Sequence, residues 1–382
     1  MKKNLAILIY SLASGGAERV VSILLNEFKY KYNITLVLMN DTMFYDIPKD
    51  TKIIFLEKSD PKENGIYKLL KLPLLGFQYK NICKENNIDV SLSFMNRPNY
   101  INTFSRLTGN NSRVLISERI VPSQEYKTAG IKDKISRNLI KHLYPKVDVI
   151  IPNAIGIKND LLKNFLISPL LINVINNPIN LTKLLISKGE FTDEISQSIY
   201  TFITIGRFEN QKNHKLMIEA MKNINAKLYI IGDGELRQAL ESQINELNLK
   251  LKVILLGRQE NPYKYLAKAD CFIFSSNYEG FPNVLLEALA CELPVISTDC
   301  QSGPREILSP TSDMEFQLKD TIELADFGIL TPVNCKDNLL KAMDLMMNDS
   351  KLRRSYKDKA LDRAKEYDKD KIIQQWFDII KD

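Results

Sequence analysis

The stretch TFITIGRFENQKNH, residues 201–214, decides the fold. Its first five residues are mostly β-branched or aromatic and end at Gly206, which is typical of a buried strand. A polar turn follows, and a helical pattern begins near Asn213. A strand that passes through a glycine turn into a helix is half of a βαβ unit, so the stretch predicts a parallel sheet.

The same alternation recurs on both sides of this stretch. Apolar runs that predict strands occupy residues 5–10, 34–39, 90–94, 114–117, 147–152, Lys227–Ile231, 253–256, Cys271–Phe274 and 295–297. Amphipathic segments such as 17–30 lie between them, and an Asn-rich and polar stretch interrupts the pattern at 173–198. We therefore predict an α/β protein with two Rossmann-like domains, at 1–185 and 186–365, and a charged helix at 366–382.

Composition limits the class of protein. The chain has 382 residues, of which 45% are hydrophobic and 26% charged, as in ordinary globular proteins. No apolar run approaches the roughly 20 residues that span a membrane, and the short run at 5–10 predicts a first strand better than a signal peptide. The five cysteines form no CxxC pair, which favours a reducing cytoplasm.

The charge is unevenly distributed. Residues 1–186 hold 26 Lys and Arg against 15 Asp and Glu, whereas the whole chain has a net charge of only +6. Within that basic half, the run 62–84 mixes lysines with bulky apolar residues. Such a run suits a segment that meets a membrane surface and a lipid-linked acceptor, although an ordinary core helix with a basic outer face would have the same composition.

Three polar motifs follow predicted strands. Gly15 and Gly16, with Glu18 and Arg19, occupy the first turn, where a glycine pair lets a ligand approach free helix N–H groups. Gly206 is followed by Arg207 and Lys212, two cations that suit a diphosphate. Alternatively, the first motif is a plain tight turn and the two cations of the second are a solvated surface pair.

The third motif, EGFPNVLLE, spans residues 279–287 and places two carboxylates eight residues apart across a Gly-Pro turn. Glu279 lies in the loop after a strand and Glu287 about one turn into a helix, where ligands of doubly wound sheets bind. Ser302 and Gly303 form another glycine turn that opens a helix. Alternatively, the pair is a helix-start acid plus an unrelated surface carboxylate.

Other chemistries find little support. His142 and His214 are the only histidines, so a histidine-based metal site or catalytic triad is improbable. No P-loop is present, and the one aspartate pair at metal-binding spacing, Asp368 and Asp370, lies in the charged tail. We expect no metal, no cofactor and no nucleic-acid partner.

Together, these motifs resemble the family 4 retaining glycosyltransferases of the GT-B fold, in which two Rossmann-like domains face a central cleft. The resemblance spans nearly the whole chain and rests on Gly206-Arg207…Lys212, on Glu279 and Glu287, and on the block 15–19. A closer likeness, to the N-acetylgalactosaminyltransferases of bacterial protein N-glycosylation, appears at 9–12, 14–21, 70–73, 96–101 and 261–265.

The resemblance implies roles for single residues. Arg207, Lys212 and Glu279 would act in catalysis. A UDP-sugar donor would contact Gly15, Gly16, Gly206, Phe281, Asn283, Val284, Glu287, Ser302 and Gly303. Glu18, Arg19, Asn96 and Arg119 would lie on the acceptor side or touch the sugar. The partners would be the donor, an undecaprenyl-diphosphate-linked glycan and the inner face of the bacterial inner membrane, and the tail helix would pack back on the first domain.

One departure from the family affects the choice of sugar. Many members have histidine where this chain has Arg119, in Ser117-Glu118-Arg119. An arginine there suits an acidic substituent, so a lipopolysaccharide or capsule enzyme with a UDP-uronic acid donor is an alternative. A UDP-sugar 2-epimerase and a binding protein without activity share the architecture and are further alternatives.

Overall fold

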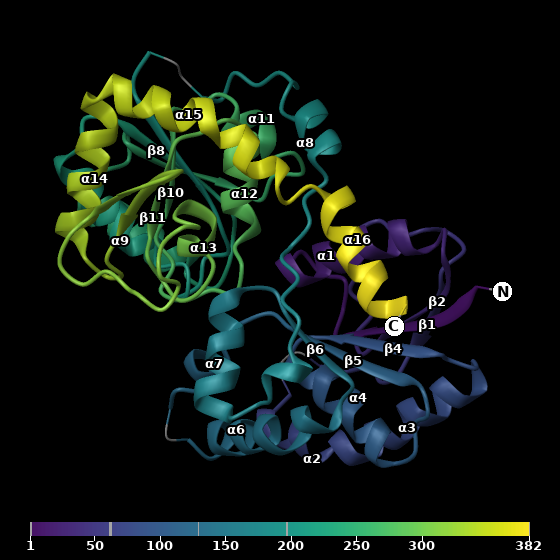
Figure 1. The fold of residues 1–382 in the computed structure, drawn as a ribbon. Coiled ribbons are helices and arrows are strands. Elements are labelled where there is room, and N and C mark those ends of the chain that lie inside the picture. The colour runs from purple at the N-terminus through teal and green to yellow at the C-terminus, as the bar shows by residue number, and fades with distance from the viewer. Residues whose placement is uncertain (1, 61–62, 129, 196–197, 382) are drawn as a thin grey trace. The chain divides into compact units, whose positions relative to one another are not determined.

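The computed structural model describes residues 2–60, 63–128, 130–195 and 198–381. These residues form two compact units. The first contains the chain up to Pro178 and again from Asp370, and the second runs from Ile179 to Lys369 (Figure 1).

The first unit contains a parallel sheet in the order β3-β2-β1-β4-β5-β6. Its strands are β1 (Lys3–Ile9), β2 (Tyr32–Leu38), β3 (Lys52–Phe55), β4 (Val90–Phe94), β5 (Arg113–Glu118) and β6 (Val149–Pro152). Its helices are α1 (Gly16–Phe28), α2 (Gly65–Leu70), α3 (Leu72–Glu85), α4 (Asn96–Leu107), α5 (Pro122–Glu125), α6 (Ile131–Leu143), α7 (Ile155–Phe165) and α16 (Lys369–Lys381), with 3-10 turns η1 (Tyr144–Lys146) and η2 (Pro169–Leu171).

Strand β4 shows why helices cover both faces of this sheet. Side chains alternate between the faces of a strand. Val90, Leu92 and Phe94 join the apolar core that contains α1 and α16. On the opposite face, Ser91 accepts or donates hydrogen bonds with Tyr79 of α3 and Asn102 of α4. The sequence Val-Ser-Leu-Ser-Phe therefore encodes one apolar face and one small polar face that lets helices pack closely.

Helix α16 completes the core of the first unit although it comes from the other end of the chain. Its buried face consists of Ile372, Ile373, Trp376 and Ile380. The Trp376 indole is fully buried, and its ring centroid lies 5.8 Å from that of Phe94. The tail helix thus packs on the first unit, as the resemblance implies.

Because Trp376 fills the centre of this core, Trp376→Ala should lower the free energy of unfolding of the first unit by about 3–5 kcal/mol. Urea unfolding followed by circular dichroism measures the change. Gln375→Ala, an exposed position on the same helix, is the control and should leave the midpoint unchanged. Equal midpoints for the two variants would contradict this account of the core.

The second unit contains a sheet in the order β12-β13-β11-β10-β7-β8-β9, in which β12 alone is antiparallel to its neighbour among the described strands. The strands are β7 (Thr201–Ile205), β8 (Lys227–Ile231), β9 (Val253–Gly257), β10 (Cys271–Phe274), β11 (Val295–Thr298), β12 (Glu323–Ala325) and β13 (Gly328–Thr331). The helices are α8 (Leu181–Ser187), α9 (His214–Ala220), α10 (Arg237–Glu246), α11 (Tyr263–Leu266), α12 (Asn283–Ala290), α13 (Pro304–Leu308), α14 (Lys336–Asn348) and α15 (Ser350–Lys365), with the 3-10 turn η3 (Met221–Asn223).

The order of the second sheet locates a binding site. The chain starts at β7, continues outward through β8 and β9, and then returns to the other side of β7 at β10. This reversal is a topological switch point, and open α/β sheets bind ligands beyond the carboxyl ends of the strands there. The loops after β7, β10 and β11 are the ones that begin at Gly206, Ser275 and Asp299.

The predicted domain boundaries at 185 and 365 are wrong by several residues. Helix α8 belongs to the second unit, because Asn180 caps its first turn and its Leu181 and Leu184 are buried there. At the other end, the main-chain N–H of Lys369 donates to the carbonyl of Ile179, so the second unit extends to Lys369. Within the described residues, no helix combines the length and apolar character that crossing a bilayer requires.

Candidate active site

The loop after β7 is shaped by glycines of the neighbouring β8 loop. Gly232 has φ +148°, and a Cβ there would lie 1.9 Å from the carbonyl oxygen of Gly206. The main chain of Gly206 donates to Ile231, and that of Phe208 donates to Asp233. Only glycine permits this approach. The turn at 232–234 thus supports the predicted diphosphate loop.

The two cations of this loop lie in different environments. Arg207 is 61% exposed in its side chain and lies 3.4 Å from a Glu209 oxygen. Lys212 is 18% exposed, and its Nζ lies 2.6 Å from Oε1 of Glu279. Three residues predicted for catalysis are therefore in one unit, and two of them form an ion pair across the β7 and β10 loops.

Two neighbouring loops bind to each other beside this ion pair. The main chain of Glu279 donates to the carbonyl of Gln301, and that of Ser302 donates to Glu279. The Ser302 hydroxyl also donates to Gly280. Gly303 has φ +97°, and a Cβ there would lie 2.8 Å from the Gly280 oxygen, so this position requires glycine. The predicted donor residues after β10 and β11 thus form one rigid surface.

Helix α12 begins on that surface. Asn283 and Val284 occupy its first two positions, where main-chain N–H groups have no partner inside the helix. Glu287 lies one turn further and is 3% exposed. Phe281 is also buried, with its ring 5.3 Å from that of Tyr367, so any contact of Phe281 with a donor would use its main chain.

His214 is buried beside the cationic loop. Its ring packs edge-on against Phe208, and a Cβ at Gly206 would lie 3.3 Å from its Nε2. Burial, together with the nearby Lys212 charge, lowers the pKa of His214 to about 3. The imidazole is therefore neutral and adds no third cation to this loop.

The predicted residues of the first unit lie at the carboxyl ends of its strands. Gly15 precedes α1 and Gly16 begins it. The Glu18 side chain turns back to this helix start, since a Cβ at Gly15 would lie 2.1 Å from a Glu18 oxygen. The Gly15 carbonyl accepts from the Tyr45 hydroxyl. Arg19 follows on the same helix and is partly buried.

Asn96 and Arg119 meet at a carboxylate that was not among the predicted site residues. Glu118, the last residue of β5, is fully buried. In the amide orientation that satisfies both neighbours, Asn96 donates to Glu118 Oε1 and Oε2 at 3.0 and 2.9 Å and accepts from the Tyr126 hydroxyl. The Tyr144 hydroxyl donates to Glu118 at 2.6 Å. In the sequence, Glu118 is marked only as a single acidic residue at the end of a predicted strand.

The Arg119 guanidinium is held next to this cluster by Ser117 and Asn177. Its Nη1 donates to Ser117 at 3.2 Å, and its Nη2 donates to Asn177. The guanidinium carbon lies 5.7 Å from the centroid of the Phe94 ring. Burial lowers the pKa of Arg119 to about 9, and the charges of Glu118 and Glu18 oppose this change. Glu18, Asn96 and Arg119 thus belong to one electrostatic cluster centred on Glu118.

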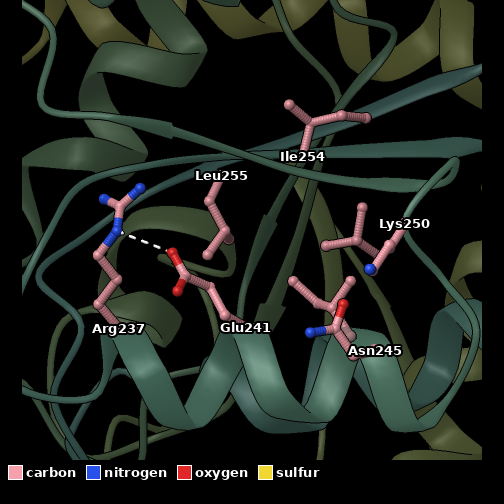
Figure 2. A pocket seen from close by; sticks show the side chains of 8 residues that line it. Arg237, Glu241, Asn245, Lys250, Ile254 and Leu255 are labelled. Atoms are coloured by element: carbon pink, nitrogen blue, oxygen red, sulfur yellow. Dashed lines mark hydrogen bonds and ion pairs between the residues drawn. The ribbon is translucent and has the colours of Figure 1, made fainter.

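No group of three or more histidine, cysteine or acidic side chains in the described part of the chain is arranged to hold a metal ion. A pocket of about 420 Å³ lies between α10 and β9 (Figure 2). Arg237 and Glu241 form an ion pair beside it, at 2.9 Å, and β9 is an edge strand. The residues lining this pocket include none of the predicted site residues, so the pocket is separate from the candidate active site.

Comparison with known proteins identifies the family. Residues 191–363 match the family of group 1 glycosyl transferases. A Campylobacter jejuni enzyme, N-acetylgalactosamine-N,N'-diacetylbacillosaminyl-diphospho-undecaprenol 4-alpha-N-acetylgalactosaminyltransferase, is 42% identical over 97% of this chain and 98% of its own length. The chain is a group 1 glycosyltransferase. This glycosyltransferase is also 28% identical to a second C. jejuni α-1,4-N-acetyl-D-galactosaminyltransferase. The match covers 99% of this chain and 98% of that relative.

Solved structures agree on the architecture of this glycosyltransferase. Sucrose-phosphate synthase from Thermosynechococcus elongatus covers 99% of the chain with a TM-score of 0.83 at 17% identity, and 98% of that structure is matched. HepE from Anabaena, solved with UDP, matches this chain with a TM-score of 0.77 at 15% identity. The match covers 99% of this chain and 99% of HepE. The fold is GT-B, and the family match supports a glycosyltransferase rather than an epimerase or a binding protein.

Proposed function

We propose that this glycosyltransferase transfers N-acetylgalactosamine, in α1,4 linkage, from UDP-N-acetylgalactosamine to an undecaprenyl-diphosphate-linked oligosaccharide of bacterial protein N-glycosylation. The observation that carries the proposal is the 42% identity to the C. jejuni N-acetylgalactosaminyltransferase over 97% of the chain. This likeness extends over both units.

The proposed donor site uses the second unit. Arg207 and Lys212 stabilise the negative charge that develops on the departing diphosphate. Main-chain N–H groups at the start of α12 add hydrogen bonds to it. Glu287 binds the ribose hydroxyls, and Glu279 binds hydroxyls of the transferred sugar.

The proposed chemistry is a front-face transfer. The acceptor hydroxyl oxygen forms a bond to the anomeric carbon as the bond from that carbon to the diphosphate oxygen breaks. The hydroxyl proton passes to the leaving phosphate oxygen, so no protein nucleophile takes part and the anomeric configuration is retained. The 2.6 Å pair between Lys212 and Glu279 supports this assignment, because it holds the cation beside the carboxylate that would orient the sugar.

Transfer to this acceptor requires contact with a membrane surface. Helices α2 and α3 present side chains that suit this contact. Ile66, Tyr67, Leu70, Leu74 and Phe77 are each at least 41% exposed, whereas Leu72, Leu75 and Tyr79 of the same segment are buried. Lys80 lies over the Phe77 ring. Exposed apolar side chains beside lysines are typical of interfacial helices. Of the predicted run 62–84, residue 62 lies outside the described residues.

Acidic substitutions should therefore release the protein from membranes. The double variant Leu74→Glu/Phe77→Glu replaces two exposed apolar side chains by carboxylates, which anionic lipid repels. We expect at least a tenfold loss of binding to phosphatidylethanolamine–phosphatidylglycerol vesicles in a sedimentation assay, from about 1 kcal/mol per charge near such a surface. Leu251→Glu, at an 89% exposed leucine of the second unit, is the control. Equal binding by both variants would refute the membrane surface.

The product tests the proposed function. The purified protein is incubated with UDP-N-acetylgalactosamine and an undecaprenyl-diphosphate disaccharide ending in N-acetylgalactosamine. We expect a lipid product heavier by one N-acetylhexosamine, with an α anomeric signal and a 1→4 linkage by NMR. A β anomer would refute the retaining mechanism, and a different linkage would refute the proposed acceptor hydroxyl.

A further inference from the structure

A buried arginine at the end of α15 takes no part in the proposed chemistry. Arg363 lies in the last turn of this helix, and its side chain is 6% exposed. Its Nε donates to the carbonyl of Ile307 at 2.9 Å. Its Nη2 donates to the carbonyl of Glu306 and to the Tyr367 hydroxyl, both at 2.7 Å. Its Nη1 pairs with Glu366, whose side chain is 53% exposed. Three of these partners are therefore neutral oxygen atoms.

Stability alone does not explain a cation in this place. Taking a cation out of water costs free energy, and neutral acceptors offset only part of that cost. What arginine adds is a rigid, planar set of donors that fixes several acceptors in one geometry. The carbonyls of Glu306 and Ile307 lie near the end of α13, where no further helical turn binds them. Arg363 thus fixes the end of α13 to the end of α15.

The Tyr367 ring extends this connection to the loop after β10. Its centroid lies 5.3 Å from that of the Phe281 ring, and both side chains are buried. Phe281 and Pro282 lead directly into α12, which packs against α15 (Figure 1). Tyr367 is also fixed by its main chain, because its carbonyl accepts from the N–H of Ile179 at 2.9 Å. Tyr367 therefore connects the end of α15 to the start of α12.

The two connections meet at Gly303. A Cβ there would lie 3.0 Å from the Cα of Phe281 and 2.6 Å from the Cδ of Pro282, so the β11 loop packs directly on the β10 loop. Helix α13 begins directly after Gly303. The contacts form a closed ring, one side of which runs from Phe281 through Gly303 and α13 to Arg363. The other side returns from Arg363 through Tyr367 to the Phe281 ring.

We propose that Arg363 and Tyr367 are positioning residues of the transfer reaction, which hold the β10 loop and the start of α12 in the arrangement that binds the donor. The proposal rests on the proposed function and deepens it, because the start of α12 is assigned to the diphosphate. When the ring of contacts is broken, only a fraction of the molecules has these segments correctly arranged. The apparent dissociation constant of UDP then rises by the inverse of that fraction.

Arg363→Met and Tyr367→Leu test the proposal. Each variant removes one part of the ring of contacts and keeps an apolar side chain in the buried space. Isothermal titration should give a UDP dissociation constant about tenfold higher than that of the wild type, or more, and the donor KM should rise with it. At saturating donor, kcat and the acceptor KM should change by less than about threefold, because the bound donor then holds the loops itself.

Matched variants separate positioning from packing. Arg354→Met removes an arginine of the same helix whose side chain is 84% exposed, and it should bind UDP as the wild type does. Tyr367→Phe keeps the ring on Phe281 and removes only the hydroxyl, so its UDP dissociation constant should stay within about threefold of wild type. Arg363→Lys keeps a cation that reaches fewer acceptors and should fall between Arg363→Met and the wild type.

Melting temperatures distinguish a structural role. A lower melting temperature of Arg363→Met and Tyr367→Leu, with UDP dissociation constants within about a factor of two of wild type, would overturn the proposal. A fall in kcat at saturating donor with unchanged UDP affinity would overturn it as well. If Arg363→Met does not fold, Tyr367→Leu decides. Use of a UDP-sugar other than UDP-N-acetylgalactosamine would refute only the proposed function, because titration with UDP does not depend on the sugar.

Discussion

Lys212→Ala should reduce kcat by about 100- to 1,000-fold while changing the acceptor KM by less than about threefold. Removal of a single preorganised group that stabilises developing charge has effects of this size. Lys212 is mostly buried, and its Nζ is fixed by Glu279 at 2.6 Å. The ion pair restricts the position of the ammonium before the diphosphate begins to leave, so its loss should affect the transition state more than the ground state.

Matched variants separate this effect from damage to the fold. Lys215→Ala removes an exposed lysine of the adjacent helix α9 and should leave kcat unchanged. Glu279→Gln keeps the shape of the partner but removes the charge that competes with phosphate for Lys212, so it should bind UDP more tightly and turn over more slowly. Near-normal kcat in Lys212→Ala would remove this residue from the diphosphate site.

Glu287→Ala should weaken UDP binding by about 10- to 100-fold, since a hydrogen bond to a charged group contributes about 1.5–3 kcal/mol. Glu287 lies one turn into α12 and is 3% exposed, at the end of the surface formed by the β10 and β11 loops. A buried carboxylate in this position can accept from both ribose hydroxyls. Isothermal titration with UDP measures the change directly.

The control for this variant is Glu246→Ala, which removes an exposed acid at the end of α10 in the same unit. Its UDP dissociation constant should equal that of the wild type. For Glu287→Ala, kcat at saturating donor should fall much less than in Lys212→Ala, because the ribose does not react. A dissociation constant within a factor of two of wild type would exclude Glu287 from the ribose site.

The sequence was most informative about short buried strands. The predicted strands Lys227–Ile231 and Cys271–Phe274 coincide with β8 and β10. Both are continuous apolar runs with polar or glycine residues at their ends, as strands buried on two faces require. The motif residues after β7, β10 and β11 were therefore placed correctly at strand ends, although their binding roles are still predictions.

Features that depend on distant contacts could not be predicted. The domain boundary was predicted at 185 from the Asn-rich and polar stretch, whereas Leu181 and Leu184 are buried in the second unit. The Lys212–Glu279 pair joins residues 67 positions apart, and its geometry arises only because β7 and β10 are neighbours. Glu118 acquires its environment from Tyr144, 26 residues further along the chain.

The most direct test of the central claim measures UDP release from a panel of UDP-sugars, with and without an undecaprenyl-diphosphate disaccharide. The panel includes UDP-N-acetylgalactosamine, UDP-N-acetylglucosamine, UDP-galactose and UDP-galacturonic acid. We predict acceptor-dependent release from UDP-N-acetylgalactosamine and no release above background from the uronic acid. Acceptor-dependent release from UDP-galacturonic acid alone would contradict the proposed donor.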